Sequence, residues 1–265
     1  MKNKKLSHNG LQGSVTSVMA ALLCILIGLF VGFLVLLAIN PAHAWADGFV
    51  RILKGGFHDA PYGVGKELAN AAPLIMTGLS VGFAFKTGLF NIGASGQYTL
   101  GAFGALYCAI MLKLPWFVCL LVAAVLGGLW GAIPGFFKAY FNINEVITSI
   151  MFNWIGLYLV NELIYQNGTG PMYDVRNTRT LNLSKNAEYA QSIIPDFGLN
   201  KMFQTNSTTI AIFLAAAVAI LIWVILNKTT FGYELKAVGL NKSAARYAGI
   251  NEKKNIILSM AIAGA

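Results

Sequence analysis

Three polar residues lie four positions apart in a stretch of the chain that is otherwise apolar: Glu145, Ser149 and Asn153. On an α-helix this spacing places all three side chains on one face. A carboxylate, a hydroxyl and an amide on one face can hydrogen-bond a polar molecule that moves past it. An ionisable group near a membrane is costly, so Glu145 is a functional hypothesis. Alternatively, Glu145 lies at the interface beside the helix N-terminus, where a carboxylate is favoured.

A second polar stretch, 86–97, separates two apolar runs and contains three glycines together with Asn91, Ser95 and Gln97. Bare lipid cannot satisfy such backbone and amide groups, so they must be buried in protein, line a watery cavity or lie at the surface. Glycine-interrupted helices of transporters commonly mark the substrate path. A plain cytoplasmic turn followed by a helix cap would have the same composition, and the spacing leaves both interpretations open.

The sequence lacks the patterns that would support catalysis. The nearest approach to a phosphate-binding loop, at 63–66, has Ala60 where the first glycine belongs and Glu67 where the hydroxyl belongs. A nucleophile elbow, a zinc-binding His-Glu-x-x-His helix and a pair of carboxylates in one apolar run are all missing. We therefore expect a chain that is not an enzyme and binds no metal or cofactor of its own.

The composition indicates which elements must position these residues. The chain of 265 residues is 57% hydrophobic and 11% charged, whereas soluble proteins carry about a quarter charged residues. A helix needs about 20 apolar residues to cross the hydrocarbon. The sequence therefore predicts an all-α, polytopic transmembrane helix bundle with about six full spans, near 15–39, 68–85, 92–112, 116–137, 146–165 and 208–226.

A seventh apolar segment, 256–265, is too short to span a membrane and runs to the last residue. Helix carbonyls that end inside a bilayer would lack partners. We therefore expect a truncated span and a sequence that continues beyond this C-terminus. The alternative is an interfacial tail.

The distribution of charge predicts an orientation. Lys2, Lys4 and Lys5 precede the first span, and alternate threading from a cytoplasmic N-terminus places eleven of the 19 Lys and Arg residues inside. Positive charge favours the cytoplasmic side. Juxtamembrane charge facing the anionic lipids of the inner leaflet explains the basic balance without nucleic acid. The expected location is the plasma membrane, with several passes and a cytoplasmic N-terminus.

Small residues recur at every fourth position in two of the expected spans. One row contains Gly93, Gly101 and Ala105, with Gln97 between the two glycines, and the other contains Gly127, Gly131 and Gly135. Rows of this kind let helix backbones approach closely, which is a main source of helix association in lipid. They predict a tight bundle and identify no cargo.

The polar segment 232–250 contains the signature of a short, capped helix. Asn241 is a good N-cap and Gly249 a good C-terminal stop, so 242–248 should form two helical turns. Such a helix is too polar to insert and too short to stand alone. A short helix with exposed Ala and Tyr side chains requires a groove on a partner.

This segment resembles the coupling segment of ABC-importer permeases, in the group that serves branched-chain amino acids, simple sugars and nucleosides. The matching positions are Gly232, Leu235, Ala237, Gly239, Asn241, Ala244, Ala245, Gly249 and Ile250. Residues 88–97 and 144–153 are similar to two further phrases of this group. Ser95 stands where the group commonly has an acidic residue, which removes one charge from the path that the resemblance implies.

The resemblance implies a division of the chain. A permease transmembrane domain covers 68–265, is incomplete at its C-terminus and contains a coupling loop at 227–255. Residues 1–67 match only in layout, as an N-terminal transmembrane helix followed by an extracytoplasmic amphipathic segment.

The resemblance also implies partners. A separate cytoplasmic ABC ATPase uses the ATP and docks on the coupling segment, a second homologous permease subunit completes the membrane complex, and an extracytoplasmic substrate-binding (lipo)protein delivers cargo. The candidates for ATPase coupling are Gly239, Asn241, Ala244, Ala245, Arg246 and Gly249. The candidates for the translocation path are Asn91, Gln97, Glu145, Ser149 and Asn153.

The three matching sequence motifs (88–97, 144–153 and 232–250) together resemble those of nucleoside-type permeases most. The expected cargo is therefore a small hydroxylated solute such as a nucleoside. A simple-sugar permease shares every motif and stays open as an alternative. From another class, an ATP-independent channel or carrier would need no ATPase.

Overall fold

The computed structural model describes the backbone of residues 3–265 and the side chains of 18–265, apart from those of Asn167 and Lys185. Lys2 and the side chains of Lys4 and Lys5 lie outside the described residues. Within this part of the chain the fold is helical. Its only strands are β1 (Tyr173–Asp174) and β2 (Arg179–Thr180), which pair antiparallel. The prediction of an all-α chain is confirmed.

The chain divides into two compact units, and the first ends at Val64. This unit contains α1 (Asn3–Ile39), the π-helical turn η1 (Ala44–Phe49), α2 (Val50–Lys54) and the 3-10 turn η2 (Gly55–Phe57). The rings of Trp45 and Phe49 stack with centroids 5.7 Å apart, and both contact Phe33 of α1. The segment expected to be amphipathic is therefore a series of short helical turns that fold back on α1.

In the described part of the chain, five segments are long and apolar enough to cross a membrane. They are Val18–Ile39 within α1, α3 (Tyr62–Phe85), α5 (Trp116–Phe141), α6 (Glu145–Tyr165) and α8 (Ala211–Lys228). The sixth expected span is α4 (Ala94–Ile110), whose 17 residues fall at the short end of the lengths that cross the hydrocarbon. It is shorter than expected because turns at 92–93 and 111 limit it at both ends. The class, a polytopic helix bundle, is confirmed.

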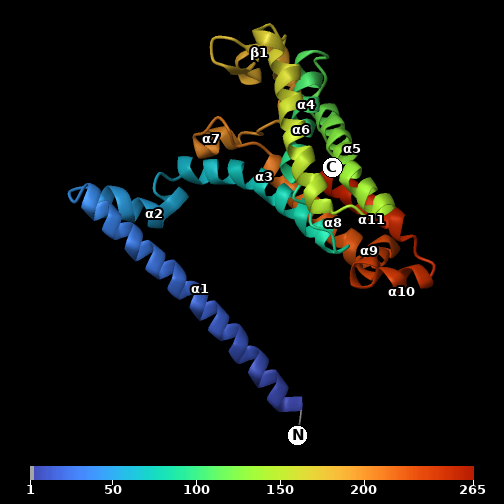
Figure 1. The fold of residues 1–265 in the computed structure, drawn as a ribbon. Coiled ribbons are helices and arrows are strands. Elements are labelled where there is room, and N and C mark those ends of the chain that lie inside the picture. Colours follow the sequence, from blue (N-terminus) through green and yellow to red (C-terminus); the bar gives the residue numbers. More distant parts are fainter. Residues whose placement is uncertain (1–2) are drawn as a thin grey trace. The chain divides into compact units, whose positions relative to one another are not determined.

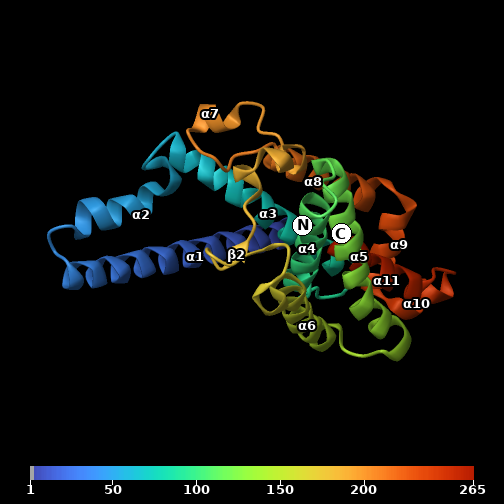
Figure 2. The ribbon, with the colours of Figure 1, turned by 90° about the horizontal axis from the view of Figure 1, so that it is seen from above.

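In the second unit, Gly65–Ala265, α5 packs against both α4 and α11 (Glu252–Gly264), and α4 also contacts α6 (Figures 1 and 2). A Cβ atom added to Gly131 would lie 2.5 Å from the backbone oxygen of Met260 in α11, and one on Gly127 would lie 2.3 Å from that of Gly264. Only glycine permits this approach. The glycine row of α5 is therefore the seat of α11, as the predicted tight packing requires.

An asparagine-rich corner joins α5 to α6. Asn142 ends α5 with φ of 53°, in the left-handed region that asparagine tolerates better than most residues. Asn144 then caps α6, because its side chain accepts a 2.8 Å hydrogen bond from the backbone N–H of Val146. The corner fixes where α6 begins and hence which residues occupy its first turns.

The segment between α6 and α8 is folded rather than extended. It contains η3 (Gln166–Gly168), β1, β2, η4 (Leu183–Lys185), η5 (Ala187–Ser192) and α7 (Leu199–Phe203). Ser192 Oγ donates a 2.6 Å hydrogen bond to the backbone oxygen of Leu114, and Glu188 pairs with Lys113. These contacts attach the segment to the α4–α5 turn.

The last part of the chain contains α9 (Thr230–Leu240), α10 (Lys242–Tyr247) and α11. The sequence predicted a polar loop with one short helix, whereas α9 is an additional helix of 11 residues. Thr229 caps α9 by accepting a 3.1 Å hydrogen bond from the N–H of Gly232. Leu235 and Val238 are completely buried, so α9 is stabilised by packing that its polar composition does not reveal.

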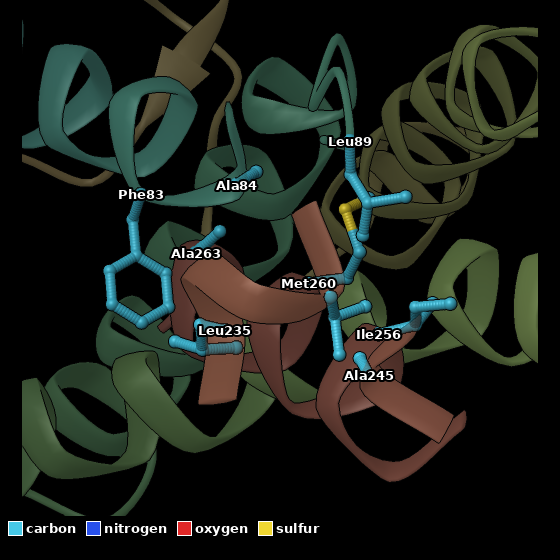
Figure 3. Close-up of a cluster of buried hydrophobic side chains, with 9 residues drawn as sticks. Phe83, Ala84, Leu89, Leu235, Ala245, Ile256, Met260 and Ala263 are labelled. Atoms are coloured by element: carbon cyan, nitrogen blue, oxygen red, sulfur yellow. The ribbon is translucent and has the colours of Figure 1, made fainter. Parts of the chain in front are cut away.

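An apolar cluster holds these helices to α3 and to the segment after it. Figure 3 shows most of its members: Phe83, Ala84, Leu89, Leu235, Ala245, Ile256, Met260 and Ala263. They come from α3, the α3–α4 connection, α9, α10 and α11. The segment 232–250, which the resemblance predicts to be the coupling segment, is thus built on the same core as the membrane helices.

Candidate functional site

The segment 86–93 joins α3 to α4, and its residues alternate between buried and exposed: Lys86, Gly88 and Phe90 are exposed. Thr87, Leu89 and Asn91 are completely buried, and Thr87 Oγ1 donates a 2.7 Å hydrogen bond to Ser259 Oγ of α11. The backbone of this segment therefore forms a turn, and its buried side chains belong to the protein core.

The side-chain amides of Asn91 and Gln97 pair with each other. Asn91 Nδ2 donates to Gln97 Oε1 over 2.9 Å, and Gln97 Nε2 donates to Asn91 Oδ1 over 3.0 Å. Asn91 Nδ2 also lies 3.0 Å from Ser80 Oγ of α3. Both amides are shielded from solvent, and a buried amide is stable only when its groups are paired. In this conformation the two amides therefore hydrogen-bond each other, and neither is open to a passing solute.

Helix α6 reaches this pair through Ser149 and Asn153. Asn153 Nδ2 donates to the backbone oxygen of Ile92, and the N–H of Gly96 donates to Asn153 Oδ1, both over 2.9 Å. A Cβ atom on Gly93 would lie 3.4 Å from Ser149 Cβ. Ser149 is completely buried, and its hydroxyl has no hydrogen-bond partner among the described residues.

Four of the five residues predicted for the translocation path thus meet in one place: Asn91, Gln97, Ser149 and Asn153. We call them the polar cluster. They supply amide and hydroxyl groups and contain no titratable side chain. The chemistry that this arrangement supports is hydrogen bonding and the joining of three elements, not acid–base catalysis.

Glu145 lies outside the polar cluster. Its carboxylate pairs with Lys138 Nζ over 2.9 Å, and both side chains are largely buried, at 13% and 17% exposure. Lys242, the first residue of α10, interacts electrostatically with both Lys138 and Glu145. Burial lowers the pKa of Lys242, as does the positive charge of Lys138, and the Glu145 carboxylate opposes them. Glu145 therefore balances charge where α5, α6 and α10 meet.

The ends of α10 follow the residues predicted for them. Asn241 Oδ1 accepts a 3.1 Å hydrogen bond from the N–H of Ala244, which is an N-cap contact. Gly249 has φ of 83°, a conformation that glycine adopts without strain. Asn251 then caps α11 through the N–H of Lys254. The chain can therefore reverse twice within a few residues and present α10 as a separate short helix.

The predicted coupling residues of α10 divide between its two sides. Ala245 is 4% exposed and packs in the apolar cluster (Figure 3), so it holds α10 to the fold and is not available to a partner at the surface. Ala244 and Arg246 are exposed, and Arg246 pairs with Glu252 of α11. Of the α10 candidates, these two are the residues that a partner can reach.

Two exposed residues were not among the coupling candidates, namely Leu240 at the end of α9 and Tyr247 at the end of α10, although the sequence analysis expected an exposed Tyr in this short helix. Leu240 is 89% exposed and Tyr247 is 97% exposed. Large apolar side chains in a polar segment were the available signal, because a two-turn helix cannot bury side chains on every side. Exposed aromatic residues such as Tyr247 are common anchors in interfaces.

The coupling segment and the segment 86–93 touch through their backbones. A Cβ atom on Gly239 of α9 would lie 2.3 Å from the backbone oxygen of Lys86. Gly88 has φ of 71°, and a Cβ atom on it would lie 3.3 Å from the backbone oxygen of Gly239. The coupling segment is thereby connected, through 86–93, to the polar cluster.

Comparison with known proteins identifies relatives over most of the chain. The family described as "Branched-chain amino acid transport system / permease component" matches residues 65–265. The guanosine ABC transporter permease protein NupP of Bacillus subtilis is 35% identical, over 99% of this chain and 70% of its own length. No solved structure matches the chain.

Two further relatives carry different cargo names. The nucleoside ABC transporter permease protein NupB of Lactococcus lactis is 33% identical, over 94% of this chain and 68% of its own length. The glucose ABC transporter permease protein TsgB13 of Haloferax volcanii is 32% identical, over 92% of this chain and 64% of its own length. The chain thus spans about two thirds of these relatives.

Proposed function

The chain belongs to the family of permease components of branched-chain amino acid transport systems, and from this premise we propose that it is a membrane subunit of an ATP-driven nucleoside importer. It is a transport subunit and not an enzyme. Its several apolar helices make it a multi-pass membrane protein. We place the N-terminus and α10 in the cytoplasm, an orientation supported by the excess of Lys and Arg on that side.

The observation that carries this proposal is the construction of α10. It is a helix of six residues, capped by Asn241 and anchored by buried Ala245, with Leu240 and Tyr247 exposed beside it. A helix this short is not stable alone, so its place in the fold is held by the apolar cluster. Its exposed side suits the groove of a cytoplasmic ABC ATPase.

The proposed partners follow from the same arrangement. A second, homologous permease subunit would complete the membrane complex. An extracytoplasmic binding protein would deliver cargo on the side opposite α10, where the segment between α6 and α8 offers a folded surface. ATP would be bound and hydrolysed by the ATPase, and differential contacts of α10 with its two states would shift the helix bundle between conformations.

A nucleoside is the cargo that the relatives favour, because NupP and NupB carry guanosine and nucleoside in their names. The uncharged amides of the polar cluster suit a neutral, hydroxylated molecule. TsgB13, a glucose permease, keeps a simple sugar as the second candidate. Uptake of labelled guanosine into cells, competed in turn by other nucleosides and by glucose, separates the two.

The docking proposal is tested with the doubly substituted variant Leu240→Ala/Tyr247→Ala. Both side chains are almost fully exposed, so the permease should fold and reach the membrane as usual. The ATPase should no longer co-purify with it, and uptake should fall at least tenfold. Tyr98→Ala is the matched control, because Tyr98 is 60% exposed on α4 and lies outside the coupling segment.

Normal uptake by the double variant would contradict the docking surface. Normal uptake after deletion of the ATPase would contradict the proposed function as a whole and favour an ATP-independent channel or carrier.

A further inference from the structure

An open pocket of about 660 Å³, called the cavity below, lies between the C-terminal half of α6 and the β1–β2 hairpin. On α6 it is lined by Tyr158, Asn161, Glu162 and Tyr165. Residues three, four and seven positions apart lie on one helix face, so these four side chains face the cavity together. The opposite wall is formed by the hairpin, through Tyr173, Thr178, Arg179 and Thr180. The volume is within the range of small-molecule sites.

The walls combine aromatic rings with unpaired hydrogen-bonding groups. The rings of Tyr165 and Tyr173 meet edge to face, with centroids 5.1 Å apart and planes at 86°. Among the described residues, Asn161 and Glu162 form no side-chain hydrogen bond or ion pair. A carboxylate and an amide that project into the cavity without partners are available to a ligand.

A row of interfacial tyrosines alone would identify no ligand, because tyrosine is enriched wherever helices leave the bilayer. Glu162 does not fit that explanation. Its side chain is exposed near the C-terminal end of α6, and it lines the cavity together with the Asn161 amide and the Arg179 guanidinium. The combination of rings, amide and carboxylate is therefore the feature that requires an explanation.

We propose that this cavity binds a nucleoside as it enters the permease, an inference that rests on the proposed function and extends it to a named site. The base would stack on Tyr158, since every base has a π-face and aromatic stacking tolerates different bases. Glu162 would accept hydrogen bonds from the ribose hydroxyls, as acidic residues do in dinucleotide sites. Asn161 would pair with the edge of the base.

The position of the cavity fits an entry site. The cavity lies at the C-terminal end of α6, near Tyr165. Glu145 is at the N-terminal end of the same helix, where its carboxylate offsets the positive charge beside α10. Figure 1 shows the hairpin and α10 at opposite ends of the second unit. From Glu145 to Glu162 the helix rises roughly 25 Å. Asn153 of the polar cluster lies between these two residues in the sequence of α6, so a solute that moves along α6 would pass it.

The test is equilibrium binding of tritiated guanosine to the complete complex of permease subunits and ATPase in lipid nanodiscs, without the binding protein. Glu162→Gln removes the charge and one acceptor with little change in shape, and Tyr158→Ala removes the stacking ring. Each is expected to weaken guanosine binding about tenfold. Tyr98→Ala, at a similar exposure outside the cavity, should bind like the unsubstituted complex.

Competition identifies the part of the ligand that is bound. Unlabelled adenosine and uridine should displace guanosine, whereas ribose, glucose and free guanine should each compete far more weakly. Displacement by glucose or ribose alone would show a sugar site and overturn the nucleoside assignment. Unchanged binding by both variants would overturn the site itself.

Uptake distinguishes failure of the site from failure of the proposed function. Suppose that cells with the unsubstituted complex import guanosine, that the complex does not bind guanosine in nanodiscs, and that Glu162→Gln leaves uptake unchanged. The cavity is then not an entry site, but the proposed function as a nucleoside importer is still supported. If guanosine is not imported at all, the proposed function fails first.

Discussion

Gly88 and Gly239 hold two distant segments in direct backbone contact. The backbone oxygen of Gly239 lies 3.3 Å from where a Cβ atom on Gly88 would stand, and a Cβ atom on Gly239 would overlap Lys86 and Thr87. Gly239 belongs to α9, and Gly88 belongs to the turn that leads into the polar cluster. We therefore expect a displacement of α9 and α10 to be transmitted to that cluster, because no flexible side chain lies between the two backbones. Packed contacts of this kind do not deform smoothly.

The first prediction concerns Gly239→Ala. The added methyl group requires the backbones of α9 and 86–88 to separate, and overpacking of this kind costs about 1–3 kcal/mol. We expect a complex that still binds and hydrolyses ATP but imports nucleoside at least tenfold more slowly, because the contact between coupling segment and polar cluster is altered. ATPase activity and uptake are measured in the same reconstituted vesicles.

Gly82→Ala is the matched control, since a Cβ atom on Gly82 of α3 would meet nothing within 4 Å. It should leave both activities unchanged. Uptake and ATP hydrolysis that fall in parallel in Gly239→Ala would indicate loss of folded protein instead, and would contradict a role in transmission.

The second prediction concerns the amide pair. Asn91→Leu leaves the Gln97 amide buried without its partner, and an unsatisfied buried polar group costs about 1–3 kcal/mol. Asn91→Leu/Gln97→Met removes both amides and should be less destabilised than either single variant. Thermal unfolding of the four proteins forms a double-mutant cycle. Additive effects would show that the two amides do not stabilise each other.

The third prediction tests the seat of α11 on α5. Gly131→Val should displace α11, because the backbone oxygen of Met260 lies only 2.5 Å from where the new Cβ atom would stand. A thermal midpoint several degrees lower is expected, and limited proteolysis should cut the chain near α11. Gly78→Val on α3, where a Cβ atom has open space, serves as the control. Equal stability of the two variants would contradict the packing described for α11.

Much of this fold is visible in the sequence because the responsible residues act locally. The spans follow from apolar runs, and Asn241 and Gly249 mark α10 because caps depend on a few neighbouring backbone groups. The glycine row of α5 indicated close packing, although its partner, α11, could not be identified from spacing alone. Such features are encoded within one or two turns of helix.

The remainder depends on contacts between distant segments. Sequence spacing placed Glu145, Ser149 and Asn153 on one helix face, yet the structure pairs Glu145 with Lys138 and only Ser149 and Asn153 reach the polar cluster. The polar composition of α9 concealed its helix, because its stability comes from the apolar cluster. Ala245 was expected at the docking surface, but whether an alanine faces inward depends on the angle at which α10 meets α9 and α11.

The last prediction concerns the charges at the start of α10. Glu145→Gln leaves Lys138 and Lys242 without the carboxylate that balances them, and loss of one partner of a largely buried pair costs about 3 kcal/mol. Part of this should be recovered in Glu145→Gln/Lys242→Gln, which removes one of the two cations. Thermal midpoints of the purified complex compare the variants.

The pH dependence gives a second readout. The pKa of Lys242 is lowered from 10.5, so in alkaline solution the unfolded chain holds this proton at pH values where the folded protein has released it. Stability rises with pH wherever the unfolded state binds more protons. The charge of Lys242 therefore lowers the folding stability at neutral pH, and this destabilisation is relieved as the pH rises through the pKa of Lys242 in the folded protein. We expect the defect of Glu145→Gln to shrink as the pH is raised through the alkaline range, and to shrink less when Lys242→Gln is also present. A defect that is the same at every pH would show that the Glu145 carboxylate acts on α10 through packing and not through charge.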